Sequence, residues 1–152
     1  GEEIIDLTRY TKEFENGFLT WKKNKYFGGG IKASYWHCSK VKVEYTKVLG
    51  GISCNTHPHN YYLESLTDLG LIGFFFIIFT FFYILKNSLT YLFEKNEYPA
   101  KTLIIPFMLI FIVEIFPLKT TGSLFTTTNS TFLFFIIAFI VSLIDLKKES
   151  KL

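Results

Sequence analysis

Two closely spaced histidines, His57 and His59, are the side chains of this sequence best suited to acid–base chemistry. An imidazole titrates near neutral pH, so it can take a proton from a reacting hydroxyl. Pro58 separates the pair, and Asn60 and Glu64 follow it. The chain before the pair is polar and basic, whereas most of the chain after it is apolar. The histidines therefore mark a border between water and lipid, where a lipid-linked substrate would present its head group.

Cationic side chains in the first sixty residues are candidates for holding phosphate. Arg9 is the single arginine of the chain, and arginine binds phosphate in a bidentate manner. From residue 17 to residue 60 there are seven lysines, among them Lys32, and one acid, Glu44. This excess suits phosphate or anionic lipid, and a merely solvated lysine-rich surface is an equally good interpretation.

Residues 1–60 are expected to form a polar region with short helices. Tyr10, Phe14, Phe18 and Trp21 recur at helical spacing, which predicts a helix with one apolar face on the membrane or on the rest of the protein. Residues 24–30, which end in three glycines, should break this helix. A turn is favoured over a phosphate-binding loop, because no phosphate-binding motif surrounds the glycines.

The two cysteines, Cys38 and Cys54, both lie in this polar region. If the region is extracytoplasmic, a disulfide between them is favoured. Zinc binding is the rival, since His37, His57 and His59 are also ligand types, although the spacing matches no compact zinc motif. Two free thiols are the third possibility.

Residues 61–152 predict an all-α membrane protein with three transmembrane helices, at about 66–85, 102–118 and 131–146. Pro58 is expected in the first turn of the first helix, where proline is tolerated. Gly70 and Gly73 share one face of that helix and should admit a neighbouring helix. Glu114, inside the second span, is a functional candidate or an interfacial acid paired with a neighbour such as Lys119.

The lysines of the short loops predict the orientation of these spans. The connection 86–101 and the C-terminal tail each carry three lysines, whereas the loop 119–130 carries one. Lysine-rich short loops face the cytoplasm. Residues 1–60 and the C-terminus would then lie on opposite sides, with residues 1–60 outside. Because the sequence opens on a long polar stretch without an initiator methionine, we expect that earlier spans precede it and that the chain alone is inactive.

The histidine stretch resembles the signature of the O-antigen ligase family of membrane glycosyltransferases. That signature is His followed by Asn, Ser or Gln, then nine arbitrary residues and Gly-x-x-Gly, and it is matched here by His59, Asn60, Gly70 and Gly73. The run of residues 54–63, CNTHPHNYYL, is similar to the Cys-Ser-Thr-His-Pro-His-Asn variant of bacterial members, and residues 24–30 resemble the Phe-Gly-x-Gly segment that precedes it. The chain departs from that variant at residues 35–36, which are Tyr-Trp where Phe-Arg is common.

The resemblance implies a multi-pass bacterial inner-membrane enzyme with residues 1–60 in the periplasm. The family moves a glycan from undecaprenyl pyrophosphate to lipid A–core or a similar acceptor, without a metal ion or other cofactor. His59 matches the essential histidine, a general base or an orienter of the acceptor hydroxyl. The expected substrate contacts, to pyrophosphate or acceptor, are Arg9, Lys32, His57, Asn60 and Glu64.

Three alternatives stay open at this point. O-antigen polymerases and protein O-oligosaccharyltransferases share the fold and the histidine loop, and residues that choose the acceptor are not identifiable here. A non-enzymatic membrane anchor or lipid-binding segment would make His59 dispensable. A zinc site would make function sensitive to a chelator. Membrane lipid is an expected partner in each case, and nucleic acid is not.

Overall fold

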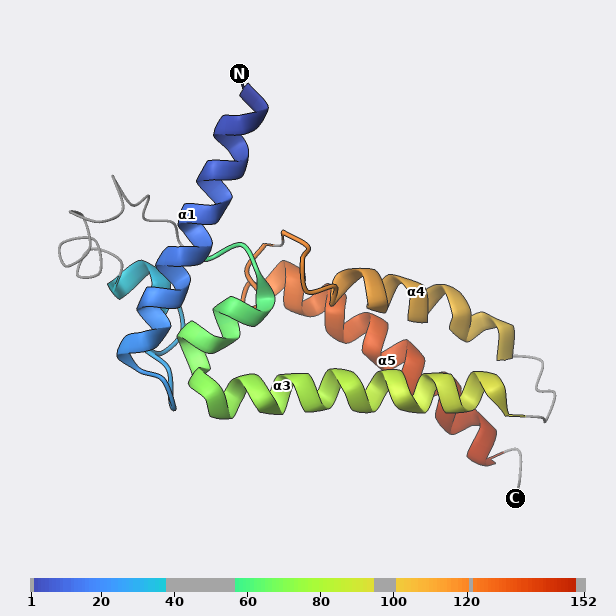
Figure 1. Ribbon diagram of the computed structural model, residues 1–152. Helices are drawn as coiled ribbons and strands as arrows, with labels where there is room; N and C mark the ends of the chain where they lie inside the picture. Colours follow the sequence, from blue (N-terminus) through green and yellow to red (C-terminus); the bar gives the residue numbers. More distant parts are fainter. Residues whose placement is uncertain (1, 38–56, 95–100, 121, 150–152) are drawn as a thin grey trace. The chain divides into compact units, whose positions relative to one another are not determined.

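The computed structural model describes residues 2–37, 57–94, 101–120 and 122–149, and no strand occurs within these ranges (Figure 1). The described elements are α1 (Glu2–Lys23), α3 (Tyr61–Phe93), the 3-10 helix η1 (Lys101–Leu103), α4 (Ile104–Glu114) and α5 (Thr127–Glu149). The prediction of an all-α chain is therefore confirmed for the described part. The chain divides into two compact units, residues 1–77 with 120–126 and residues 78–119 with 127–152.

Helix α1 packs against the rest of the protein with a polar side, so only the second of the two predicted locations of its apolar face, on the rest of the protein, is not observed. Glu13, Asn16 and Thr20 are buried, whereas Phe18 is 44% exposed. These three positions recur every three or four residues and so form one side of the helix. At Gly17, on the same side, a β-carbon would lie only 2.7 Å from Leu63 Cδ2, so the backbone of α1 packs closely on the start of α3.

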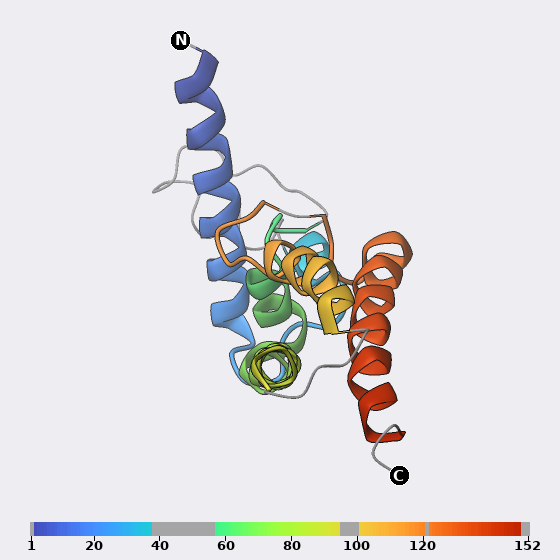
Figure 2. The ribbon, with the colours of Figure 1, turned by 90° about the vertical axis from the view of Figure 1, so that its right-hand side faces the viewer.

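Helix α3 is two helices joined by a break at Gly70, whose φ is 68° and ψ −168°. In Figure 1 the green part of α3 before the break and the yellow-green part after it run in different directions, and in Figure 2 the later part is seen end-on. The apolar stretch that follows the break contains no charged residue until Lys86. The helix continues to Phe93, eight residues past the expected end at residue 85, and within this extension the hydroxyls of Ser88 and Thr90 donate to carbonyls one turn earlier.

Two helices of the described chain, α3 and α5, are long and apolar enough to cross a membrane. Only 22% and 17% of their most apolar segments are buried inside the protein, unlike a core helix of a soluble domain. The exposed side chains of α3 include large aromatic ones: Phe75, Phe76, Phe79 and Phe82. Two of the three predicted spans thus correspond to helices of sufficient length.

The remaining predicted span, 102–118, coincides with η1 and the 11-residue α4. At 1.5 Å per residue, α4 is about 17 Å long, less than the ~30 Å apolar layer of a bilayer. The helix ends before Pro117, as expected for a chain that approaches a proline. Within the unit of residues 78–119 and 127–152, α4 packs on α5, and the ring centroids of Phe107 and Phe139 are stacked 4.8 Å apart.

Glu114 at the end of α4 forms an ion pair with Lys119, with 2.6 Å between Oε2 and Nζ. This contact is the pairing with a neighbour that the sequence offered as one of two explanations for an acid in this segment. It supports a structural role for Glu114.

Candidate functional site

The break in α3 is held by the loop that follows α1, residues 24–32, which we call the glycine loop. The N–H groups of Gly29 and Gly30 donate to the carbonyls of Thr67 and Asp68 at the end of the first part of α3. Gly29 and Gly30 thus supply the carbonyls at the end of the helix with donors that a continuing helix would have provided.

The same loop also caps the start of the second part of α3. The N–H groups of Leu71 and Ile72 donate to the carbonyls of Lys25 and Tyr26. Backbone groups next to an apolar layer must be paired within the protein, and these bonds supply the partners. The glycine run is therefore a structural turn, as the sequence favoured. The neighbour admitted by Gly70 is this loop, not the helix that we expected.

Gly73 has a different neighbour from the one expected. A β-carbon on Gly73 would lie 2.2 Å from Cβ of Leu69, on the other side of the break. Gly73 thus makes room for the chain's own turn at Gly70. Gly70 and Gly73 therefore have separate structural tasks, one toward the glycine loop and one toward Leu69.

Asn60 is the N-cap of α3. Its side-chain oxygen accepts the N–H groups of Tyr62 and Leu63, both at 3.1 Å. The helix consequently begins at Tyr61, and Pro58 lies before it rather than in its first turn. The nine arbitrary residues of the signature, 61–69, are the helix between this cap and the break at Gly70.

His59 lies between α1 and the start of α3 and approaches a buried carboxylate. Its Nε2 is 3.7 Å from Oε2 of Glu13, and the two side chains are 33% and 3% exposed. The backbone of His59 has φ 53°, an uncommon conformation for a residue other than glycine. A partly exposed imidazole can act as a general base toward a hydroxyl bound beside it, and a neighbouring carboxylate can orient the ring.

His57 packs against His59, with 4.3 Å between the ring centroids. Burial lowers the pKa of His57 below its ordinary value of 6.5, and repulsion by a charged His59 lowers it further. At neutral pH His57 is therefore uncharged, which suits a packing neighbour of His59 better than a phosphate ligand.

We expect this unfavourable protonation to appear as acid lability. Below pH 6.5 the unfolded chain binds a proton at His57 that the folded chain binds only at lower pH, so stability falls as the pH falls from 6.5. In thermal unfolding measured between about pH 8 and pH 5, His57→Gln should lose part of the acid-induced decrease in Tm seen in the wild type. If Tm decreases with pH to the same extent in both proteins, the lowered pKa of His57 is contradicted.

Glu64 is 2% exposed, and both of its oxygens are bonded within the protein. Oε1 accepts the hydroxyl of Ser123 at 2.5 Å, and Oε2 accepts the N–H of Leu124 at 2.6 Å. This carboxylate ties the segment before α5 to the helix that follows the histidines. Its geometry makes it a positioning residue rather than a direct ligand of a substrate.

The other predicted contacts are placed as follows. Lys32 lies in the glycine loop with φ 65°, its side chain exposed and its N–H bonded to Asp68 Oδ2. Arg9 lies in α1, four residues before Glu13, and these two positions are on one face of the helix.

The two cysteines predicted to pair, Cys38 and Cys54, lie outside the described residues. Within the described part no three His, Cys, Asp or Glu side chains are grouped to hold a metal ion.

Two carboxylates of this region were not among the predicted site residues. Glu13 follows Arg9 at i+4, a spacing that could have indicated a shared face. Asp68 accepts the N–H groups of Lys32 and Ala33 and so orders the glycine loop. The available signal was an acid three residues before the apolar stretch 71–85, because such an acid needs buried partners.

Comparisons with family models, with curated proteins and with solved structures found no match to this chain. The assignment of a function therefore depends on the geometry of the candidate site and on the sequence signature.

Proposed function

We propose that this chain is part of a membrane glycosyltransferase of the O-antigen ligase type. The observation that carries the proposal is the contact of His59 with buried Glu13, directly before the capped helix 61–69 and the Gly70 break. In this proposal His59 takes the proton from the acceptor hydroxyl, and Glu13 orients the imidazole and stabilises its charge. The hydroxyl oxygen attacks the anomeric carbon of the glycan, and undecaprenyl pyrophosphate leaves.

Arg9 is the proposed ligand of the leaving pyrophosphate. Its position in α1 is four residues, about one helical turn, before that of Glu13, and a guanidinium can bind a pyrophosphate in a bidentate manner. A charge that develops on the leaving pyrophosphate is stabilised by such a cation without a metal ion. Asn60 and Glu64 support the site by fixing the start of the helix.

The proposal includes a topology for the chain in the bacterial inner membrane. Residues 1–60 lie in the periplasm, where the donor glycan is displayed, and the C-terminus lies in the cytoplasm. This arrangement needs three crossings, and because α4 alone is shorter than the apolar layer, the proposal requires η1, α4 and the residues up to 118 to form the middle one together. The lysine-rich connection 86–101 and tail support it. Acceptor identity separates a ligase from a polymerase or a protein O-oligosaccharyltransferase, whereas all three use the same donor.

The test is donor-dependent glycan transfer in membranes that contain the protein as its gene encodes it. We expect transfer from undecaprenyl pyrophosphate-linked glycan that persists in EDTA. Arg9→Ala should lower it by about 10-fold or more, the loss of one charged phosphate contact. Lys12→Ala, at a nearby position of α1, is the control for a nonspecific effect of charge. Equal activity of Arg9→Ala and wild type at equal protein level would contradict the role of Arg9, and no transfer to any acceptor would contradict the function.

A further inference from the structure

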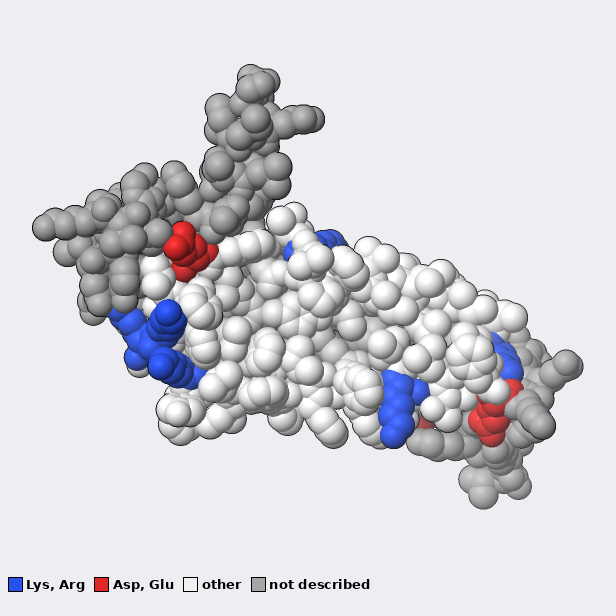
Figure 3. Space-filling view, viewed as in Figure 1, with Lys and Arg blue, Asp and Glu red and all other residues white. Residues whose placement is uncertain are grey.

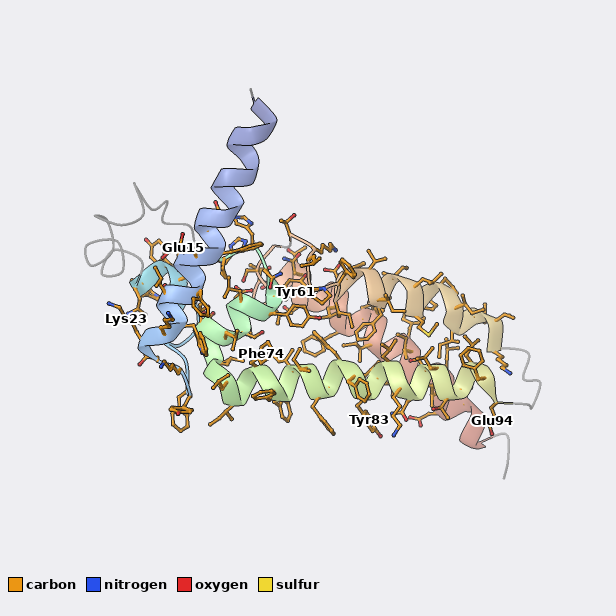
Figure 4. The ribbon with its side chains drawn as sticks, in the orientation of Figure 1. Glu15, Lys23, Tyr61, Phe74, Tyr83 and Glu94 are labelled. Atoms are coloured by element: carbon orange, nitrogen blue, oxygen red, sulfur yellow. The ribbon has the colours of Figure 1, made fainter. Side chains whose placement is uncertain are left out.

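The compact unit that contains residues 1–77 has a surface that combines exposed aromatic side chains with lysines. Because α1 buries its polar side, Phe18 remains at the surface. Tyr26 and Phe27 are 67% and 81% exposed, and Trp36 is 65% exposed. Blue atoms gather near the C-terminal end of α1 in Figure 3, and Figure 4 labels Lys23 there. The exposed lysines of this segment are Lys22, Lys23, Lys25 and Lys32.

We call the surface formed by these aromatic side chains and lysines the basic–aromatic surface. The glycine loop fixes it at the start of the apolar part of α3. The hydrogen bonds from Leu71 and Ile72 to the carbonyls of Lys25 and Tyr26 hold the glycine loop beside the first turn after the break. The fifteen residues that follow, 71–85, carry no charge. Tyr26 and Phe27 are thus held at the level where an apolar helix would enter a membrane.

The basic–aromatic surface carries an excess of positive charge. Residues 17–37 contain four lysines and no acid. Asp68, the carboxylate beside the loop, is buried and bonded to the N–H groups of Lys32 and Ala33. Aromatic rings flanked by lysines are typical of the membrane–water boundary, where rings enter the upper acyl chains and ammonium groups meet lipid phosphates.

We propose that the basic–aromatic surface lies in the head-group layer of a membrane that contains anionic lipid. Tyr26, Phe27 and Trp36 contact the upper acyl chains, and Lys25 and Lys32 contact lipid phosphates. The surface would hold the glycine loop, and through it the Gly70 break, at a fixed depth. This inference does not depend on glycan transfer and holds for an enzyme or for a non-enzymatic membrane protein.

Trp21 and Trp36, the two tryptophans of the chain, are natural probes of this surface. The full chain is reconstituted in nanodiscs of phosphatidylcholine and phosphatidylglycerol, with bromine near the head group on one lipid at a time. We expect tryptophan fluorescence to be quenched at least twofold more by brominated phosphatidylglycerol than by brominated phosphatidylcholine at the same mole fraction. Trp36→Phe should remove most of the quenching, since Trp36 is the more exposed ring.

A matched pair of double variants tests the lysines. Lys25→Gln/Lys32→Gln should make the two brominated lipids equally effective, whereas Lys147→Gln/Lys148→Gln, which removes the same charge from α5, should leave the preference intact. Absence of quenching by either lipid in the wild type would overturn the proposal. Equal quenching by both lipids in the wild type would overturn the head-group selectivity of the lysines.

Discussion

Replacing His59 with alanine is expected to lower glycan transfer by about 100- to 10,000-fold, the range for loss of a general base. The protein level should not change, because the His59 side chain is one third exposed. The matched control is His57→Ala, which removes a neighbouring ring of the same kind, 4.3 Å away between centroids. If both variants lose activity equally, the loop is disturbed as a whole and His59 has no separate chemical role.

Variants of Glu13 distinguish a role in proton transfer from a role in packing. Glu13→Gln keeps the size of the side chain and removes its charge, so it should lower the turnover rate of transfer with little change in the KM for the donor. Glu13→Asp, which keeps the charge, should restore part of the rate. Activity that follows side-chain size rather than charge would contradict the role of Glu13 beside His59.

Replacing Gly70 with alanine should prevent accumulation of a stable protein. An added β-carbon would lie 2.4 Å from the backbone nitrogen of Gly28 and from the carbonyl of Tyr26, atoms that cannot move without breaking the loop. The φ and ψ of Gly70 also belong to a region that is almost restricted to glycine. We expect a loss of several kcal/mol, to be measured as yield and as Tm in detergent; ~3 kcal/mol or more is typical of such combined strain and overlap.

Gly30→Ala is the control for the backbone conformation alone. Gly30 has φ 88°, and a β-carbon there would meet no atom within 4 Å. The cost should therefore be limited to about 1–2 kcal/mol of conformational strain. Similar Tm values for Gly70→Ala and Gly30→Ala would show that the close approach of the glycine loop to α3 does not contribute to stability.

The sequence predicted elements where one physical signal dominated. Apolar runs located α3 and α5, and the glycine run located the turn after α1. Signals that compete with each other gave errors. Apolar spacing in α1 predicted an aromatic face on the membrane or on the rest of the protein, and the side that packs on the protein instead holds Glu13, Asn16 and Thr20, which tertiary contacts select. At Gly70 the small side chain was assigned to helix packing, because the partner loop lies more than forty residues earlier and leaves no local pattern.

The candidate site was predictable to a similar extent. The histidines were identified from residue type and position alone. The pairing of His59 with Glu13 was not, since it joins positions 46 residues apart through the packing of two helices. The bonds from Ser123 and Leu124 to Glu64 span about sixty residues and were equally invisible.

The short helix 61–69 acts as a spacer of fixed length and fixed phase. Its nine residues rise about 14 Å between Asn60 and Gly70. One inserted residue would lengthen it by about 1.5 Å and rotate His59 by about 100° around the helix axis, away from Glu13. The helix therefore sets both the height of the imidazole above the apolar segment and the direction from which a lipid-borne group must approach it. A homologous chain with a longer spacer would need to gain whole turns, not single residues, to keep the same geometry.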